Sequence, residues 1–70
     1  MKQKEQQVIS RTEIADELRS VADMIEAGSM RVGDATVDIP EDSIEFEIEL
    51  EETPEKIELE FELKWGTPGV

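Results

Sequence analysis

The sequence predicts a two-layer α+β fold, in which one amphipathic helix packs on a four- or five-stranded antiparallel sheet of hairpins. Three patterns predict it. Apolar and charged residues alternate over residues 44–51 and again over 56–65, apolar residues recur at helical spacing over 14–25, and a Gly-Asp pair divides residues 30–39. Alternation with a period of two is typical of a strand with one dry face, whereas spacing by three and four residues is typical of a helix.

The helix is expected to begin near Arg11 and to end at Gly28. Ser10 and Glu13 have the spacing of a capping box, in which each side chain accepts a hydrogen bond from an otherwise unpaired backbone N–H. Gly28 can adopt the left-handed conformation that closes a helix. Between these ends, one stripe contains the apolar residues Ile14, Leu18, Val21, Ala22 and Ile25. Before the helix, Val8-Ile9 is the candidate for a short additional strand.

A short hairpin is expected after the helix. Gly33-Asp34 suits a two-residue turn with glycine at its first position. This turn pairs Val32 with Ala35 and Met30 with Val37, so the apolar side chains share one face.

Pro40 ends that pairing, and the two longest strands follow. Their expected register gives one apolar face, with Leu50 opposite Ile57, Ile48 opposite Leu59, Phe46 opposite Phe61 and Ile44 opposite Leu63. Trp65 belongs to this face by parity and is expected to close the rim of the core. The helix stripe is the other large apolar surface of the sequence, so we expect it to cover this face.

The chain is expected to form a single small domain over residues 1–70, with an ordered core at about 8–65 and flexible tails at 1–7 and 66–70. A domain of this size buries about 60% of the surface of its unfolded chain, which leaves no room for a deep catalytic cleft. The sequence contains no Cys and no His, so the usual nucleophile–base pairs and thiolate metal sites cannot be built. We therefore expect no enzyme activity, catalytic residue, cofactor or metal site.

The composition is strongly acidic, with 19 Asp and Glu against 7 Lys and Arg and a net charge of −12. A polyanion repels nucleic acid and anionic membranes, so we expect neither as a partner. The first residues lack the apolar run of a signal peptide, which favours a cytoplasmic location.

The outer face of the long hairpin is the candidate partner-binding face. The expected register opposes glutamates on it: Glu45 with Glu62, Glu47 with Glu60, and Glu49 with Glu58. Like charges in direct opposition destabilise a sheet, at about 0.2–1 kcal/mol per pair. One explanation is adaptation to salt, because the Debye length falls to about 3 Å at molar ionic strength. A second is a binding face for a basic protein. A Ca²⁺ or Mg²⁺ site is disfavoured, because Ca²⁺ takes about 6–8 converging oxygens and a flat face offers few.

The run Ile57-Glu-Leu-Glu-Phe-Glu-Leu-Lys-Trp65 follows an alternating run from Ile44 and a helix that ends at Gly28. Together they resemble the Amphi-Trp domain family, which is named for alternating apolar and charged residues that run into a tryptophan. The resemblance covers residues 8–65. It implies a small archaeal or bacterial domain of uncharacterised function, with many members in haloarchaea, and it supplies no activity, cofactor or site residue for this chain.

We therefore expect a small acidic interaction module that acts through self-association or through a basic protein partner. The alternative is a structural or adaptor domain whose acidic surface is only an adaptation to salt.

Overall fold

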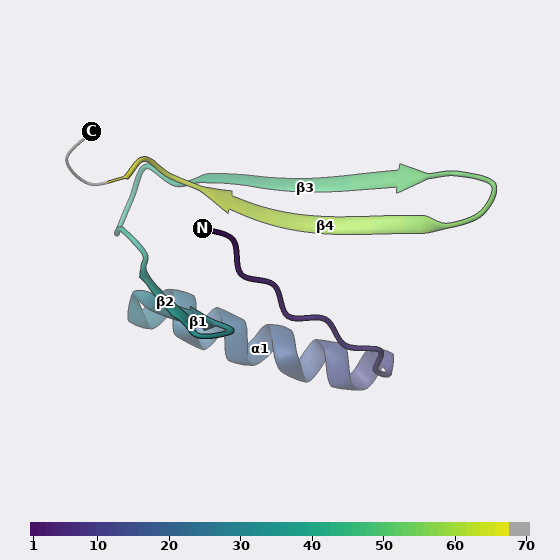
Figure 1. Ribbon diagram of the computed structural model, residues 1–70, viewed down its shortest axis with the longest axis horizontal. Helices are drawn as coiled ribbons and strands as arrows, with labels where there is room; N and C mark the ends of the chain where they lie inside the picture. Colours follow the sequence, from purple (N-terminus) through teal and green to yellow (C-terminus); the bar gives the residue numbers. More distant parts are fainter. Residues whose placement is uncertain (68–70) are drawn as a thin grey trace. The chain divides into compact units, whose positions relative to one another are not determined.

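The computed structural model describes residues 1–67 and confirms the α+β class, with one helix and four antiparallel strands in that part of the chain (Figure 1). The elements follow in the order α1 (Arg11–Ala27), β1 (Ser29–Val32), β2 (Ala35–Asp38), β3 (Glu45–Glu52) and β4 (Ile57–Lys64). The strands form two sheets of two strands each, β1 with β2 and β3 with β4. The chain divides into a first unit, residues 1–40, and a second unit that begins at Glu41. Residues 68–70 of the expected C-terminal tail lie outside the described residues.

The helix α1 begins and ends as the sequence predicts. Ser10 Oγ accepts a hydrogen bond from the backbone N–H of Glu13 at 3.1 Å, and Glu13 Oε1 accepts one from the N–H of Ser10 at 3.4 Å, so the capping box is formed. At the other end, Gly28 has a φ of 91°. Its N–H donates to the carbonyl oxygens of Met24 at 3.0 Å and Ile25 at 3.1 Å. A residue with a Cβ is strained at this φ, which explains the glycine.

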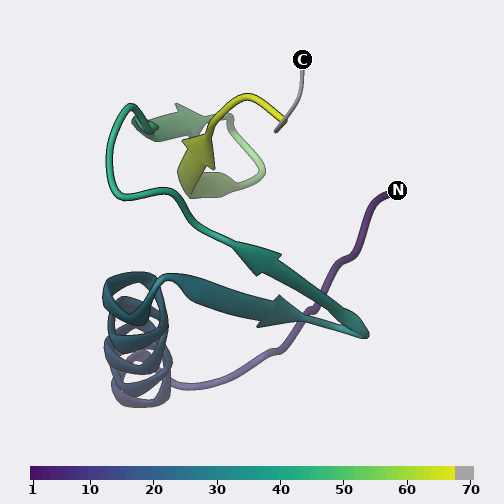
Figure 2. The same cartoon turned by 90° about the vertical axis from the view of Figure 1, so that its left-hand side faces the viewer.

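The strands β1 and β2 form a short hairpin after the helix (Figure 2). Its register is the predicted one, with Met30 opposite Val37. Gly33 has a φ of 59° at the first turn position, whereas Asp34 keeps a negative φ. This combination is that of a type II′ turn, whose twist matches that of the flanking strands. The N–H of Ile39 also donates to the carbonyl oxygen of Gly28 at 2.8 Å, so the pairing continues to the end of α1.

The first unit packs α1 against β1. No described side chain of the chain is fully buried. The half-buried apolar side chains of this unit come from both elements and include Val21, Met24, Ile25, Met30 and Val32. Ile14 and Leu18, on the N-terminal half of the helix stripe, remain 46% and 45% exposed. The small hairpin therefore covers only the C-terminal half of that stripe.

Residues 1–10 contain neither a helix nor a strand, so the short strand expected at Val8-Ile9 does not form. The segment nevertheless contacts the turn between β1 and β2. Glu5 Oε1 accepts a hydrogen bond from the N–H of Gly33 at 2.8 Å. The Gln3 side-chain oxygen lies 2.7 Å from where a Cβ on Gly33 would stand, so a larger residue there would displace Gln3.

The long hairpin of β3 and β4 is present, but its register differs from the expected one by two residues. The structure pairs Leu50 with Leu59, Ile48 with Phe61 and Phe46 with Leu63. The expected pairs Leu50–Ile57, Ile48–Leu59, Phe46–Phe61 and Ile44–Leu63 were therefore wrong. Ile57 lies opposite Glu52, and Ile44 precedes β3.

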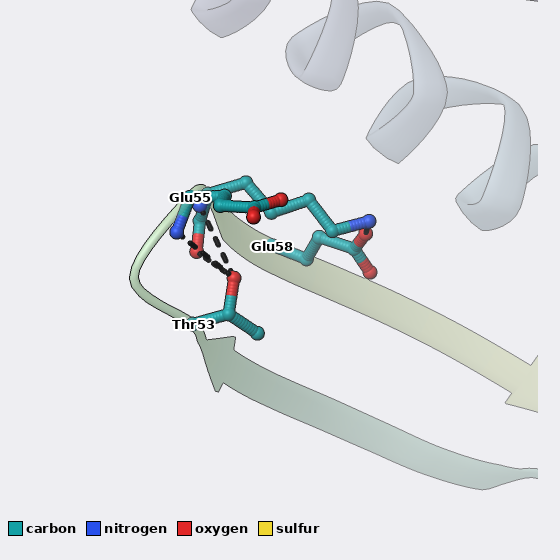
Figure 3. A network of polar contacts seen from close by, with 4 residues as sticks. Thr53, Glu55 and Glu58 are labelled. Carbon is teal, nitrogen blue, oxygen red and sulfur yellow. Dashed lines mark hydrogen bonds and ion pairs between the residues drawn. The ribbon is translucent and has the colours of Figure 1, made fainter.

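The turn explains this shift. The N–H of Thr53 donates to the carbonyl oxygen of Lys56 at 2.9 Å, so the turn between the two strands consists of Pro54 and Glu55 alone. Thr53 Oγ1 accepts from the N–H groups of Glu55 and Lys56 at 3.3 and 3.2 Å and donates to the Lys56 carbonyl oxygen at 3.3 Å (Figure 3). The ring of Pro54 fixes φ at about −65°, the value at the first central position of a type I turn. The expected register would make Thr53-Pro54 the central pair of the turn and place Pro54 at the second position, where proline is disfavoured, and it would lose the hydrogen bond between Thr53 and Lys56.

Among the residues that the structure describes, no helix combines the length and the apolar character that a bilayer crossing requires.

The capping box gives a direct stability test. Replacing Ser10 by alanine removes the acceptor for the N–H of Glu13, and we expect the free energy of unfolding to fall by about 1 kcal/mol. Urea unfolding followed by far-UV circular dichroism measures this. Ser20→Ala, on an exposed turn inside α1, is the matched control and should leave stability unchanged or raise it slightly, because alanine is the better helix former. Equal losses in both variants would contradict a capping role for Ser10.

Candidate interaction surfaces on the long hairpin

The long hairpin has two chemically different faces, because successive side chains of a strand point to opposite sides. The acidic face contains Glu45, Glu47, Glu49 and Glu51 of β3 with Glu58, Glu60 and Glu62 of β4. The apolar face contains Phe46, Ile48 and Leu50 of β3 with Ile57, Leu59, Phe61 and Leu63 of β4. Glu52 shares the apolar face, at the end next to the turn.

All six glutamates predicted for the acidic face lie on it, but their partners differ from the predicted ones. The like-charge pairs are Glu47 with Glu62, Glu49 with Glu60, and Glu51 with Glu58. The predicted pairs Glu45–Glu62, Glu47–Glu60 and Glu49–Glu58 were therefore wrong. Glu45 lies opposite Lys64, which removes one repulsive pair and makes an attractive one. Glu51 is the residue that the prediction missed, although its place in the alternating run 44–51 already assigned it to this face.

Two lysines close the acidic face at its ends. Lys56 Nζ lies 2.5 Å from Glu58 Oε1 beside the turn. At the open end of the hairpin, Lys64 Nζ lies 3.3 Å from Glu62 Oε1 and 3.7 Å from Glu47 Oε2. Within the described residues, Glu49 and Glu60, in the middle, take part in no ion pair. Of the three like-charge pairs, Glu49–Glu60 is therefore the one in which neither carboxylate has an ion pair with a described lysine.

These contacts shift both lysines in the same direction. A hydrogen bond to Glu58, together with its charge, raises the pKa of Lys56. The hydrogen bond and charge of Glu62 are the main cause of the raised pKa of Lys64, with smaller contributions from the charges of Glu45 and Glu47. Both ammonium groups are at the surface, where solvent screens these attractions.

The charge of the chain is concentrated in its second part. Residues 41–70 contain two lysines and 11 acidic residues, which leaves a net charge of −9 there out of −12 for the whole chain. A surface with this excess attracts cations and basic groups over several ångströms and repels other anions. Across residues 1–67, no group of three or more acidic side chains is arranged to hold a metal ion.

The second unit by itself leaves most of the apolar face exposed. Ile57 is 71% exposed, Phe46 62% and Phe61 49%, and the exposures of Ile48, Leu50 and Leu59 lie between these values. Leu63 and the following Trp65, at the open end, are half-buried. Scattered apolar residues on a surface are ordinary, whereas contiguous apolar patches are typical of interaction surfaces.

The fold and these two faces define the class of protein: a small acidic α+β domain whose longest element is an amphipathic hairpin running into a tryptophan. The model of the Amphi-Trp domain family matches residues 1–69, and the chain belongs to this family. The resemblance predicted from the sequence is therefore confirmed. Neither the curated proteins nor the solved structures contain a match to the chain.

The central like-charge pair predicts a salt-dependent gain in stability. Glu60→Lys turns the opposition of Glu49 and Glu60 into an attraction, so we expect it to stabilise the hairpin by about 0.4–2 kcal/mol at low salt, twice the usual value of one pair. The gain should disappear in molar KCl. Urea unfolding at both salt concentrations measures it. Glu41→Lys makes the same change in net charge before β3 begins, and a gain as large in this control would show that only net charge matters.

The raised pKa of Lys64 predicts a loss of stability at alkaline pH. The pKa of Lys64 is higher in the folded chain than in the unfolded chain, where it is about 10.4, so the protonated lysine stabilises the fold. This stabilisation is complete at a pH below the pKa of the unfolded chain and is lost as the pH rises through the pKa of the folded chain. We expect the urea midpoint of the wild type to fall from about pH 10 upward. In Lys64→Gln the fall should be smaller and the midpoint at pH 8 lower. Lys2→Gln, outside the hairpin, should keep the wild-type fall, and identical curves for the two variants would contradict the assignment.

Proposed function

We propose that this protein is a small acidic interaction module of the cytoplasm, which acts through self-association or through a basic protein partner and catalyses no reaction. The observation that carries the proposal is the apolar face of the long hairpin, on which six large side chains are 49–71% exposed. Contiguous apolar patches that stay open in a single chain are typical of interaction surfaces. A surface of this kind in so small a domain is easier to explain by an interaction than by a reaction.

The acidic face supports the basic partner. Its seven glutamates form two adjacent rows, and the centre around Glu49 and Glu60 has no neutralising lysine within the described residues. A complementary basic surface would remove the repulsion between the paired carboxylates and gain attraction at the same time. The same charge disfavours nucleic acid and anionic membranes as partners.

As the alternative to self-association, we also propose that α1 of the same chain covers the apolar face of the long hairpin. In this two-layer arrangement, the strands join into one sheet of four or five and α1 lies over it. The lengths support it: α1 has 17 residues and β3 has 8, about 25 and 27 Å respectively. The exposed side chains of Ile14 and Leu18 on α1 would then contact the apolar face. In that case the acidic face would remain as the interaction surface.

The second candidate function is a structural or adaptor domain whose acidic surface is only an adaptation to salt. The like-charge pairs Glu47–Glu62, Glu49–Glu60 and Glu51–Glu58 favour it, because each of them weakens the hairpin until salt screens it.

A titration with a synthetic lysine-rich peptide distinguishes the two functions. We expect the double variant Glu47→Lys/Glu60→Lys to bind the peptide at least about tenfold more weakly than the wild type, because it reverses the charge of one member in each of two like-charge pairs. The matched control, Glu17→Lys/Glu26→Lys, changes the net charge equally on exposed positions of α1 and should lose much less. Isothermal titration calorimetry at 0.05 and 0.15 M KCl measures both.

Equal losses in the two double variants would mean that the peptide senses net charge alone. That result, with a change only in the salt dependence of folding, would favour salt adaptation over a binding face. No binding by the wild type at either salt concentration would exclude the basic partner.

A further inference from the structure

We propose that the apolar face of the long hairpin binds a second copy of this chain. In this dimer the two hairpins pack face to face about a two-fold axis, with their acidic faces outward. This proposal rests on the part of the proposed function that invokes self-association. It specifies the surface through which two copies associate and their relative orientation.

The area of the face is sufficient for a dimer. Aromatic side chains bury about 150–250 Å² each, and aliphatic ones less, so the six side chains that are 49–71% exposed offer on the order of 600 Å². Two copies would bury roughly 1,200 Å² in total, which is the lower end of the range for specific interfaces. Such a dimer would be weak to moderate in affinity, and its interface would be dominated by apolar contact.

A second hairpin also matches this face better than the helix of the same chain does. Of the large apolar residues on α1, Ile14 and Leu18 are the strongly exposed ones, because β1 already contacts the helix. Two aliphatic side chains cannot cover six, two of which are phenylalanines. An identical hairpin supplies an equal area and an equal set of side chains, which is the self-complementarity that a two-fold interface requires.

Electrostatics selects face-to-face packing over joining at the strand edges. Edge pairing would place the glutamate rows of two copies side by side and leave both apolar faces open. In a face-to-face pair the sheets lie about 10 Å apart and the glutamates point away from each other, so the two acidic faces are roughly 20 Å apart. At 0.15 M salt the Debye length is about 8 Å, so the remaining repulsion between copies is largely screened. Salt should therefore strengthen the dimer.

The position of Glu52 sets the relative direction of the two hairpins. This carboxylate lies on the apolar face beside the turn, opposite Ile57. If the turns of both copies lay at the same end, each Glu52 would face the partner's Ile57 and the two carboxylates would lie side by side at that end of the interface, which is costly for unpaired charges. With the hairpins antiparallel, each Glu52 lies at the open end of its partner, at the rim. Ile48, near the middle of β3, then lies close to the two-fold axis.

Chemical cross-linking tests this geometry, because the sequence contains no cysteine and single thiols can be introduced without background. Ile48→Cys places a thiol on the apolar face, and Glu49→Cys places one on the acidic face a single residue away. Facing sheets are about 10 Å apart, too far for a direct disulfide but within reach of a short bis-maleimide. We expect most of Ile48→Cys to become a covalent dimer at micromolar concentration and Glu49→Cys to stay monomeric. Cross-linking of both variants alike, or of neither, would overturn the proposal.

Sedimentation equilibrium gives the second measurement. The wild type should have twice the chain mass of 7.9 kDa at 0.5 M KCl and dissociate as salt is lowered. Ile48→Glu should have the mass of one chain, and Glu49→Gln should dimerise at least as well as the wild type. Circular dichroism shows whether Ile48→Glu is folded, and the cross-linking test does not depend on it. A wild type that remains monomeric at all salt concentrations overturns this inference but leaves the basic partner intact, because the peptide titration tests that partner separately.

Discussion

The alternation of apolar and charged residues in β3 and β4 is the constraint on which the rest of the structure depends. Because side chains alternate across a strand, a hairpin with this pattern has one apolar and one charged face in any register that keeps the parity. Two strands alone cannot bury such an apolar face, since a two-stranded hairpin is at best marginally stable in water. The exposure of Phe46 and Ile57 is therefore a direct consequence of the sequence pattern, and a covering surface is a physical requirement.

The parts of the fold that could be predicted from the sequence are those that residues a few positions apart decide. The Ser10–Glu13 capping box, the closure of α1 at Gly28 and the turn at Gly33 were all correct, because each depends on a few local hydrogen bonds or on one φ angle. The register of the long hairpin was wrong for a related reason. A shift by two residues leaves every side chain on its face, so alternation cannot decide it, and the hydrogen bonds of Thr53 do.

The same distinction between parity and register decides what could be predicted about the acidic face. Membership of the face depends only on parity, so all six expected glutamates were placed correctly. Their partners depend on register, so the pairings of Glu45 with Lys64 and of Glu51 with Glu58 followed only from the structure. The ion pairs of Lys56 and Lys64 also depend on the register. They relieve the repulsion at the two ends of the face and leave it between Glu49 and Glu60.

The two faces respond to salt in opposite ways, which connects the proposals for this protein. Salt screens the attraction between the acidic face and a basic partner, so that interaction weakens as ionic strength rises. Salt also screens the repulsion between two copies that carry a net charge of −12 each, so association through the apolar face strengthens. Rising ionic strength therefore favours both the folding of a salt-adapted hairpin and self-association, whereas it weakens the binding of a basic partner. At high ionic strength association through the apolar face would dominate, whereas at low ionic strength binding through the acidic face would.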